Sequence, residues 1–97
     1  MELRKAQRYD LRLPFRLVRQ GHRSVSVPGE TRNLSSKGVL FRSSSRLQVG
    51  DLVEYVITLP VQPGPKGPPA LHCLGKIVRF GKNADVAATL ERYEFVR

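Results

Sequence analysis

The 97-residue sequence contains one cysteine, two histidines, no tryptophan and no long apolar run. The single Cys73 excludes a disulfide within the chain and is compatible with a reducing compartment. No segment approaches the roughly 20 apolar residues that a membrane-spanning helix needs. The first ten residues, MELRKAQRYD, lack the apolar stretch of a signal peptide. From these absences we expect a soluble, cytoplasmic protein.

Residue types that support catalysis or metal binding are equally scarce. His72 and Cys73 are neighbours in an apparently extended segment, so their side chains should point to opposite faces of a strand and cannot share a metal ion. Cys73 is expected to be a buried packing residue, and His22 an exposed turn residue. The sequence has no zinc-ligand spacing, P-loop or dinucleotide-binding glycine cluster. We therefore expect no enzymatic activity, no metal and no resident cofactor.

Positive charge is what the sequence has in excess. Seventeen Lys and Arg residues against eight Asp and Glu give a formal net charge of +9, with a pI near 10.6. Most of the cations are arginines, whose planar fork matches phosphate groups and guanine edges and stacks on flat rings. This surplus favours an anionic, phosphate-bearing partner. The alternative is a basic surface that serves only solubility.

Alternating apolar residues predict short strands along most of the chain. From Leu11 to Leu17 every second residue is apolar, which is the pattern of a half-buried strand. Residues 52–59 are expected to form the longest strand, and residues 71–80 another. The last segment, 86–96, fits either a strand or a helix. Turns or breaks are expected at 20–23, 28–29, 35–38, 43–45, 60–69 and 81–83. Five to seven strands at roughly ten-residue spacing predict one closed or partly open antiparallel barrel over residues 11–97, preceded by a polar, flexible segment at 1–10.

Two short motifs stand out against this pattern. Arg4 and Arg8 form an RxxxR motif ahead of the first strand, and residues 33–38, NLSSKG, form an NxSxxG motif between two strands. Each motif is weak by itself: arginines also stand at 12 and 16, so the RxxxR spacing recurs, and Asn, Ser and Gly are common turn residues. Their order is more specific, because LPFRL at 13–17 lies between them, and GD at 50–51 and GKIVR at 75–79 follow. In this arrangement nearly the whole chain resembles the PilZ domain, a bacterial module that binds the second messenger cyclic di-GMP.

The resemblance implies a six-stranded antiparallel split β-barrel, in which the C-terminal helix of the family is short or absent here. By the same resemblance Arg4 and Arg8 clamp cyclic di-GMP, Asn33 and Ser35 contact a guanine, and Gly38 supplies a backbone angle that other residues resist. Asn33 departs from the more common Asp. The expected function is a monomeric receptor that orders its N-terminal segment on binding and passes the signal to a protein partner.

Leu3 immediately precedes the RxxxR motif and borders the space that a second nucleotide would fill. Its branched apolar side chain offers no hydrogen bond to a phosphate or guanine. We therefore expect one ligand per chain.

Two other functions remain open. One is a PilZ-like adaptor that binds a protein and has little or no affinity for nucleotides. The other is a small basic barrel that binds RNA or single-stranded DNA, which would need exposed aromatic residues for base stacking. Most of Phe15, Phe41, Phe80 and Phe95 stand at apparent core positions, so we expect no nucleic-acid binding.

Overall fold

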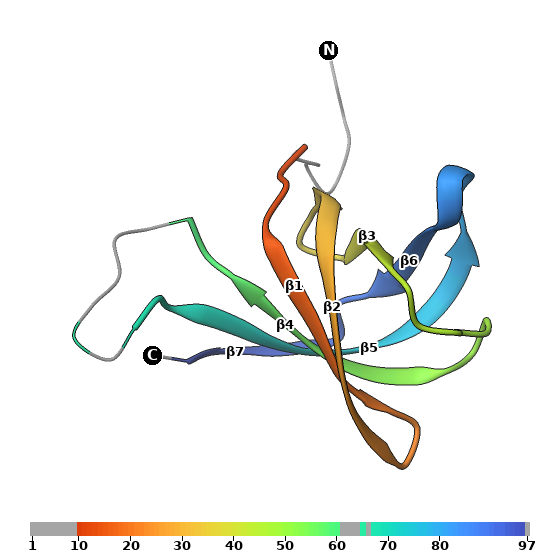
Figure 1. Ribbon diagram of the computed structural model, residues 1–97, viewed down its shortest axis with the longest axis horizontal. Helices are drawn as coiled ribbons and strands as arrows, with labels where there is room; N and C mark the ends of the chain where they lie inside the picture. Colours follow the sequence, from red (N-terminus) through yellow and green to blue (C-terminus); the bar gives the residue numbers. More distant parts are fainter. Residues whose placement is uncertain (1–9, 61–64, 66, 97) are drawn as a thin grey trace.

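The computed structural model describes residues 10–60, 65 and 67–96, which form seven strands. The strands are β1 (Pro14–Gln20), β2 (Arg23–Leu34), β3 (Gly38–Ser43), β4 (Leu52–Thr58), β5 (Ala70–Phe80), β6 (Asp85–Thr89) and β7 (Arg92–Val96) (Figure 1). Helical structure in this part of the chain is limited to one 3-10 turn, Lys82–Ala84. Within the same residues no helix has the length and apolar character needed to cross a membrane.

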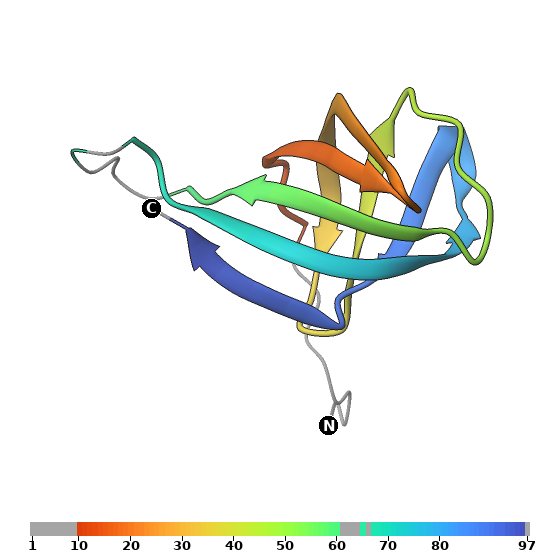
Figure 2. The ribbon, with the colours of Figure 1, turned by 90° about the horizontal axis from the view of Figure 1, so that it is seen from below.

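Six of the strands close into an antiparallel barrel. They follow each other in the order β4-β1-β2-β3-β6-β5, and β5 pairs back to β4. The seventh strand, β7, pairs with the first half of β5, while β6 pairs with its second half. As Figure 2 shows, β7 runs along the outside of the barrel beside β5. The predicted six-stranded barrel with almost no helix is therefore confirmed.

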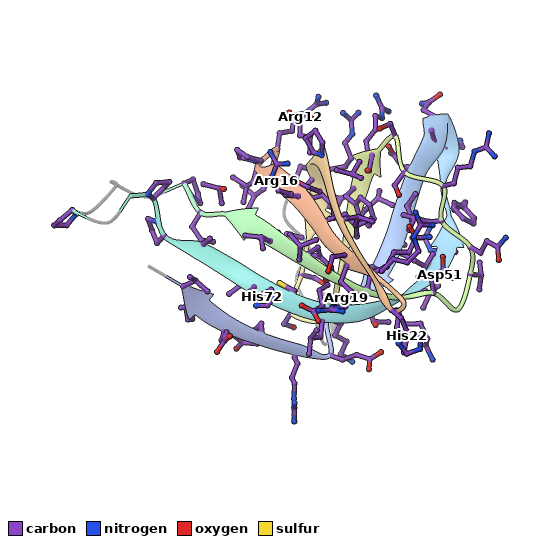
Figure 3. The ribbon with its side chains drawn as sticks, turned by 60° about the horizontal axis from the view of Figure 1, so that its bottom comes forward. Arg12, Arg16, Arg19, His22, Asp51 and His72 are labelled. Atoms are coloured by element: carbon purple, nitrogen blue, oxygen red, sulfur yellow. The ribbon has the colours of Figure 1, made fainter. Side chains whose placement is uncertain are left out.

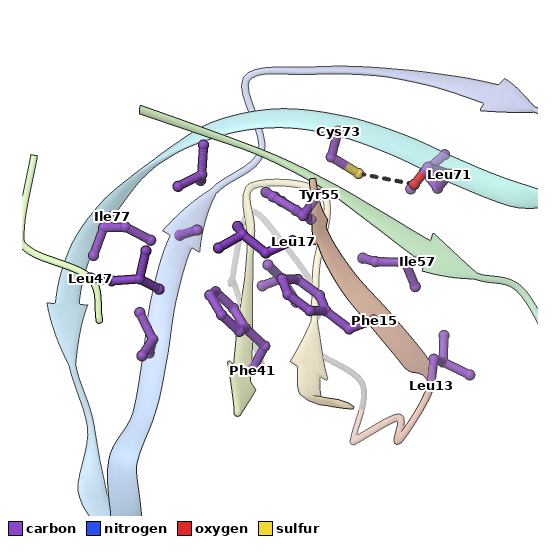
Figure 4. Packing of buried hydrophobic residues seen from close by; sticks show 14 residues of the cluster. Leu13, Phe15, Leu17, Phe41, Leu47, Tyr55, Ile57, Leu71, Cys73 and Ile77 are labelled. Atoms are coloured by element: carbon purple, nitrogen blue, oxygen red, sulfur yellow. Dashed lines mark hydrogen bonds between the residues drawn. The ribbon is translucent and has the colours of Figure 1, made fainter. Parts of the chain in front are cut away.

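Aromatic residues fill the centre of the barrel (Figure 4). The rings of Phe15 and Phe41 stack with centroids 4.2 Å apart, and Tyr55 lies 5.3 Å from Phe15. The alternation predicted for the first strand is confirmed, because Leu13, Phe15 and Leu17 are buried. The complete cluster consists of Leu13, Phe15, Leu17, Val39, Phe41, Leu47, Val53, Tyr55, Ile57, Leu71, Cys73, Ile77, Val86 and Ala88.

Two expectations about the strands were wrong: the break at residues 28–29, and residues 52–59 as the longest strand. The break expected at residues 28–29 is absent, because β2 continues through Pro28 and Gly29 and is the longest of the described strands. A Cβ at Gly29 would clash with the Arg42 carbonyl oxygen of β3, so this glycine permits close strand packing and does not mark a turn. The first strand begins at Pro14, although alternating burial already starts before it. The segment 86–96, left open between helix and strand, forms strands β6 and β7.

His72 and Cys73 lie on opposite faces of β5, as predicted. Cys73 is fully buried, and its burial raises the pKa of the thiol from 9.0 to about 12. The His72 ring points outward and its Nε2 lies 3.0 Å from a carboxylate oxygen of Glu54. The predicted exposure of His22 is also confirmed. No group of three or more potential metal ligands is found among the described residues.

Candidate ligand-binding face

The NxSxxG motif forms a short turn between β2 and β3. The Ser35 amide donates to the Gly38 carbonyl at 3.0 Å, and the Ser35 hydroxyl accepts a hydrogen bond from the Lys37 amide at 3.2 Å. The Lys37 carbonyl in turn accepts from the amide of Leu90, just beyond β6. These bonds hold the turn against the β6 end of the barrel.

Gly38 has a different role from the one expected. Its backbone does not adopt a positive φ, so the predicted need for an unusual backbone angle is wrong. A Cβ at this position would lie 2.6 Å from the carbonyl oxygen of Ala88 on β6. Gly38 is required because β3 and β6 approach each other closely beside the turn.

A β-bulge places Asn33 on the outside of the barrel. Thr31 is fully buried, and strict alternation would turn Asn33 inward as well. The pairing of β2 with β3 instead shifts between Thr31 and Asn33, so that Arg32 is an extra residue and Asn33 pairs with Leu40. Such bulges reverse the alternation and commonly re-aim a side chain. Asn33 therefore faces outward beside Leu40.

A second bulge does the same for Arg79. The pairing of β5 with β6 shifts between Ile77, which is buried, and Arg79, which is exposed and pairs with Ala87. Since Ala87 also pairs with Leu40, the register sets four residues in one row across β2, β3, β6 and β5. The row is Asn33, Leu40, Ala87 and Arg79.

This row crosses a shallow depression of about 230 Å³. Its floor is apolar, and the turn residue Ser35 and Asn33 lie along one side with Arg79 along the other. An apolar floor with a hydrogen-bonding amide and an arginine at its sides suits a flat ring with polar edges. The volume is below the roughly 300–1,000 Å³ of typical ligand pockets, so a bound molecule needs further cover. The lining residues are Asn33, Leu34, Ser35, Lys37, Gly38, Val39, Leu40, Val78, Arg79, Ala87, Ala88 and Thr89.

The chain ahead of β1 is fastened close to this depression. The buried Thr31 hydroxyl accepts a hydrogen bond from the Leu13 amide at 2.8 Å and donates one to the Leu11 carbonyl. Residues 11–13 are thereby held alongside Thr31, two positions before Asn33. The predicted site residues Arg4 and Arg8, like Leu3 and most of the segment 1–10, lie outside the described residues.

Several outward arginines of the barrel already have partners. Figure 3 shows Arg12 just ahead of β1, Arg16 on β1, and Arg19 near His72. Arg16 donates to Ser26 at 2.7 Å, and Arg19 lies 3.0 Å from Glu54. Of the two arginines that repeat the RxxxR spacing, Arg12 lies 4.0 Å from a Glu30 carboxylate oxygen and Arg16 bonds to Ser26. Among the described residues, Arg79 has no carboxylate within ion-pair distance.

A larger depression of about 540 Å³ lies near the other end of β3. Its polar groups bond mainly to each other: the Gln20 amide nitrogen donates to Asp51 at 3.2 Å and to the Arg46 carbonyl at 2.8 Å, and Gln48 donates its amide to Asp51. These contacts close the loop between β3 and β4. The NxSxxG motif does not line this depression.

Comparisons with known proteins agree with the geometry. The sequence profile described as PilZ domain matches residues 2–95. The chain belongs to the PilZ domain family. Its structure is similar to that of the Bacillus subtilis inhibitor of motility (MotI/DgrA), with a TM-score of 0.64 and 18% sequence identity. The match covers 100% of this chain and 44% of the MotI/DgrA chain, and at this identity it shows the PilZ fold alone. No curated protein sequence matches the chain.

Sequence reasoning brought Asn33, Ser35 and Gly38 together but did not assign Arg79 to the site. The resemblance already included the run GKIVR, which ends at Arg79. Strict alternation from the buried Ile77 would place Arg79 inside the barrel, and the bulge that turns it outward has no signature in the local sequence. The signal that could have found it is a cation at the end of an apolar strand segment, since such a residue is rarely buried.

Proposed function

We propose that this PilZ domain is a receptor for cyclic di-GMP and has no enzymatic activity of its own. The observation that supports this most directly is the outward row in which two bulges align Asn33 with Arg79 across an apolar floor. The row lies next to the NxSxxG turn, so the polar residues expected to bind a guanine share one face with an arginine.

The chemistry of a guanine matches this face. The base presents O6 and N7 as acceptors for the Asn33 amide group and for the Ser35 hydroxyl, which would then give up its long 3.4 Å hydrogen bond to the Gly38 carbonyl. Its flat surface can lie on Leu40 and Ala87. The Arg79 guanidinium can stack on the purine or pair with a phosphate, since arginine does both well.

Arg4 and Arg8 complete the proposed site by covering the ligand. Leu11 is tied to Thr31, and three residues of extended chain span at most about 10 Å, so the covalent reach of Arg8 includes the neighbourhood of Asn33. We infer that the segment 1–10 becomes ordered over the ligand and that the changed surface is what a downstream protein recognises. Hydrogen exchange tests this: ligand should slow exchange in the segment, and equal exchange with and without ligand contradicts the mechanism.

Calorimetric titration with cyclic di-GMP tests the binding, with cyclic di-AMP as the control ligand. Arg8→Ala, Asn33→Ala and Arg79→Ala should each weaken binding by about 1–3 kcal/mol, the value of a lost base contact. Arg16→Ala is the matched control. Arg16 is an arginine of the outer surface that bonds to Ser26, and it pairs with Pro28 of β2, away from Asn33 and its row. Normal binding by Arg8→Ala together with lost binding by Arg12→Ala would show that the clamp is not formed by Arg4 and Arg8. No binding by the unchanged protein favours the adaptor function.

The same titration measures stoichiometry. We propose one ligand per chain, because Leu3 offers a second nucleotide no hydrogen bond. Leu3→Arg should raise the number toward two. Two ligands on the unchanged chain, or no change on substitution, contradict this role of Leu3.

A further inference from the structure

Strand β7 is exposed along its whole length. All five residues from Arg92 to Val96 are exposed, and Tyr93, Phe95 and Val96 account for three of the seven large exposed apolar residues in the described part of the chain. On one edge β7 pairs with β5; its other edge has no strand partner among the described residues. Figure 2 shows this edge facing away from the barrel.

The two faces of β7 differ in chemistry. Tyr93 pairs with Cys73 and Phe95 with Leu71, so both aromatic side chains extend the apolar face of β5 beyond the part that the barrel covers. Their rings contact each other edge to face, with centroids 6.1 Å apart. The opposite face has Arg92 and Glu94.

An exposed sheet edge of this kind can pair with another strand. Proteins usually protect such edges with proline, lysine, a bulge or charges on the inward face. Strand β7, RYEFV, has no proline or lysine, no bulge in its pairing with β5 and no charge on its aromatic face. Its backbone and aromatic residues are therefore available to a partner.

We propose that the partner is a second copy of this chain, joined through antiparallel pairing of β7 with β7 about a two-fold axis at Tyr93. Residues that oppose each other in an antiparallel sheet lie on the same face. The two-fold axis must therefore pass between the two copies of one residue, which then oppose each other. An axis at Tyr93 sets Arg92 opposite Glu94 of the second copy, twice by symmetry. An axis at Arg92 or Glu94 would oppose like charges, which destabilises a sheet. With an axis further along β7, Arg92 and Glu94 of the two copies no longer oppose each other.

The same register also brings the aromatic residues together. Tyr93 opposes its own copy, and each Phe95 lies diagonal to the Tyr93 of the second copy, which is within reach of aromatic side chains. With the axis at Tyr93 only residues 92–94 of the two β7 strands oppose each other, so the interface is small, below the roughly 1,200 Å² of standard stable complexes. The dimer is therefore a weak one that depends on protein concentration. It departs from the monomer expected from the sequence, and it does not depend on cyclic di-GMP binding.

Sedimentation equilibrium over a wide range of concentrations tests the proposal. The weight-average mass should rise from 10.9 kDa toward twice that value. Glu94→Arg and Arg92→Glu should each weaken association by about tenfold, because each turns both attractive pairs into repulsive ones. An equimolar mixture of the two variants should associate again, since every pair across the interface is then of opposite charge. Glu30→Arg on β2 is the control for Glu94→Arg, as it changes the net charge by the same amount and sign at an exposed carboxylate away from β7.

Three results would overturn the proposal. One is a constant mass of 10.9 kDa at every concentration. Another is a dimer that persists in both single variants, which would place the interface elsewhere. The third is a mixture of the two variants that stays monomeric, which would show that these charges do not oppose each other.

Discussion

Two ionisable side chains face each other inside the barrel, where Cys73 of β5 pairs in register with Tyr55 of β4. Burial raises the pKa of the Cys73 thiol from 9.0 to about 12, and burial also raises the pKa of Tyr55 above its ordinary value. The Tyr55 hydroxyl donates to the Thr89 carbonyl at 2.9 Å, which requires the protonated form. Both groups therefore stay neutral in the folded protein while they can ionise in the unfolded chain.

The sign of the resulting pH dependence follows from these shifts. Below pH 9.0 the thiol is protonated in both states, and its contribution to stability is complete. As pH rises toward about 12 the unfolded chain releases the proton first, so the free energy of unfolding falls by about 1.4 kcal/mol per pH unit for this group. Urea unfolding at stepped pH measures the slope. Cys73→Ala should reduce the slope by one proton, and an unchanged slope would contradict the role given to the thiol.

At the scale of elements, two of the turns between strands differ in the strain of their backbone. The β5–β6 turn contains Asn83 and Ala84 at φ values of 58° and 66°, whereas the β1–β2 turn has Gly21 at 61°. A left-handed conformation costs a residue with a Cβ about 1–2 kcal/mol, and asparagine tolerates it better than alanine. Ala84 is thus a strained residue at a position suited to glycine.

We predict opposite effects at these two turns. Ala84→Gly should relieve strain and raise the free energy of unfolding by about 0.5–1 kcal/mol, after the greater entropy of glycine in the unfolded chain is subtracted. Gly21→Ala should lower it by a similar amount through backbone strain alone, because a Cβ there meets no atom within 4 Å. Chemical unfolding of both variants measures the two effects. Destabilisation by Ala84→Gly would show that the turn does not hold this conformation in solution.

The strands also show how far the sequence predicts this structure. Alternation places the first strand correctly, since burial of one face has a strong period of two, and turn residues place the NxSxxG turn. It fails at Asn33 and Arg79, because each follows a bulge that reverses the alternation, and a bulge is decided by pairing with distant strands. It fails again at Pro28 and Gly29, where a local turn signal is overridden by close packing against Arg42. The motif was thus predictable, but the row that joins it to Arg79 was not.

At the scale of the whole molecule, the distribution of aromatic residues bears on the type of ligand. Phe15 and Phe41 lie in the core as expected, but Phe80 and Phe95 are 51% and 68% exposed, so the expectation that most phenylalanines are buried was wrong. The reason is that β5 ends at Phe80 and Phe95 belongs to β7, outside the closed barrel. Neither residue lines the depression beside the motif turn. Among the residues that the structure describes, that depression has no row of stacking residues such as single-strand binding proteins typically have.

The net charge of +9 makes salt dependence the measurement that separates a nucleotide receptor from a nucleic-acid binder. A protein that neutralises many phosphates loses affinity steeply with salt, with a logarithmic slope of about −0.7 per phosphate for single strands. Cyclic di-GMP has two phosphates, and Arg16 and Arg19 on the outer surface are occupied by Ser26 and Glu54. We therefore expect a slope no steeper than about −2 for cyclic di-GMP. Titrations at several salt concentrations should be run in parallel with a random single-stranded oligonucleotide. Tight, strongly salt-dependent binding of the oligonucleotide, without preference for cyclic di-GMP over cyclic di-AMP, would count against the receptor and for a nucleic-acid-binding barrel.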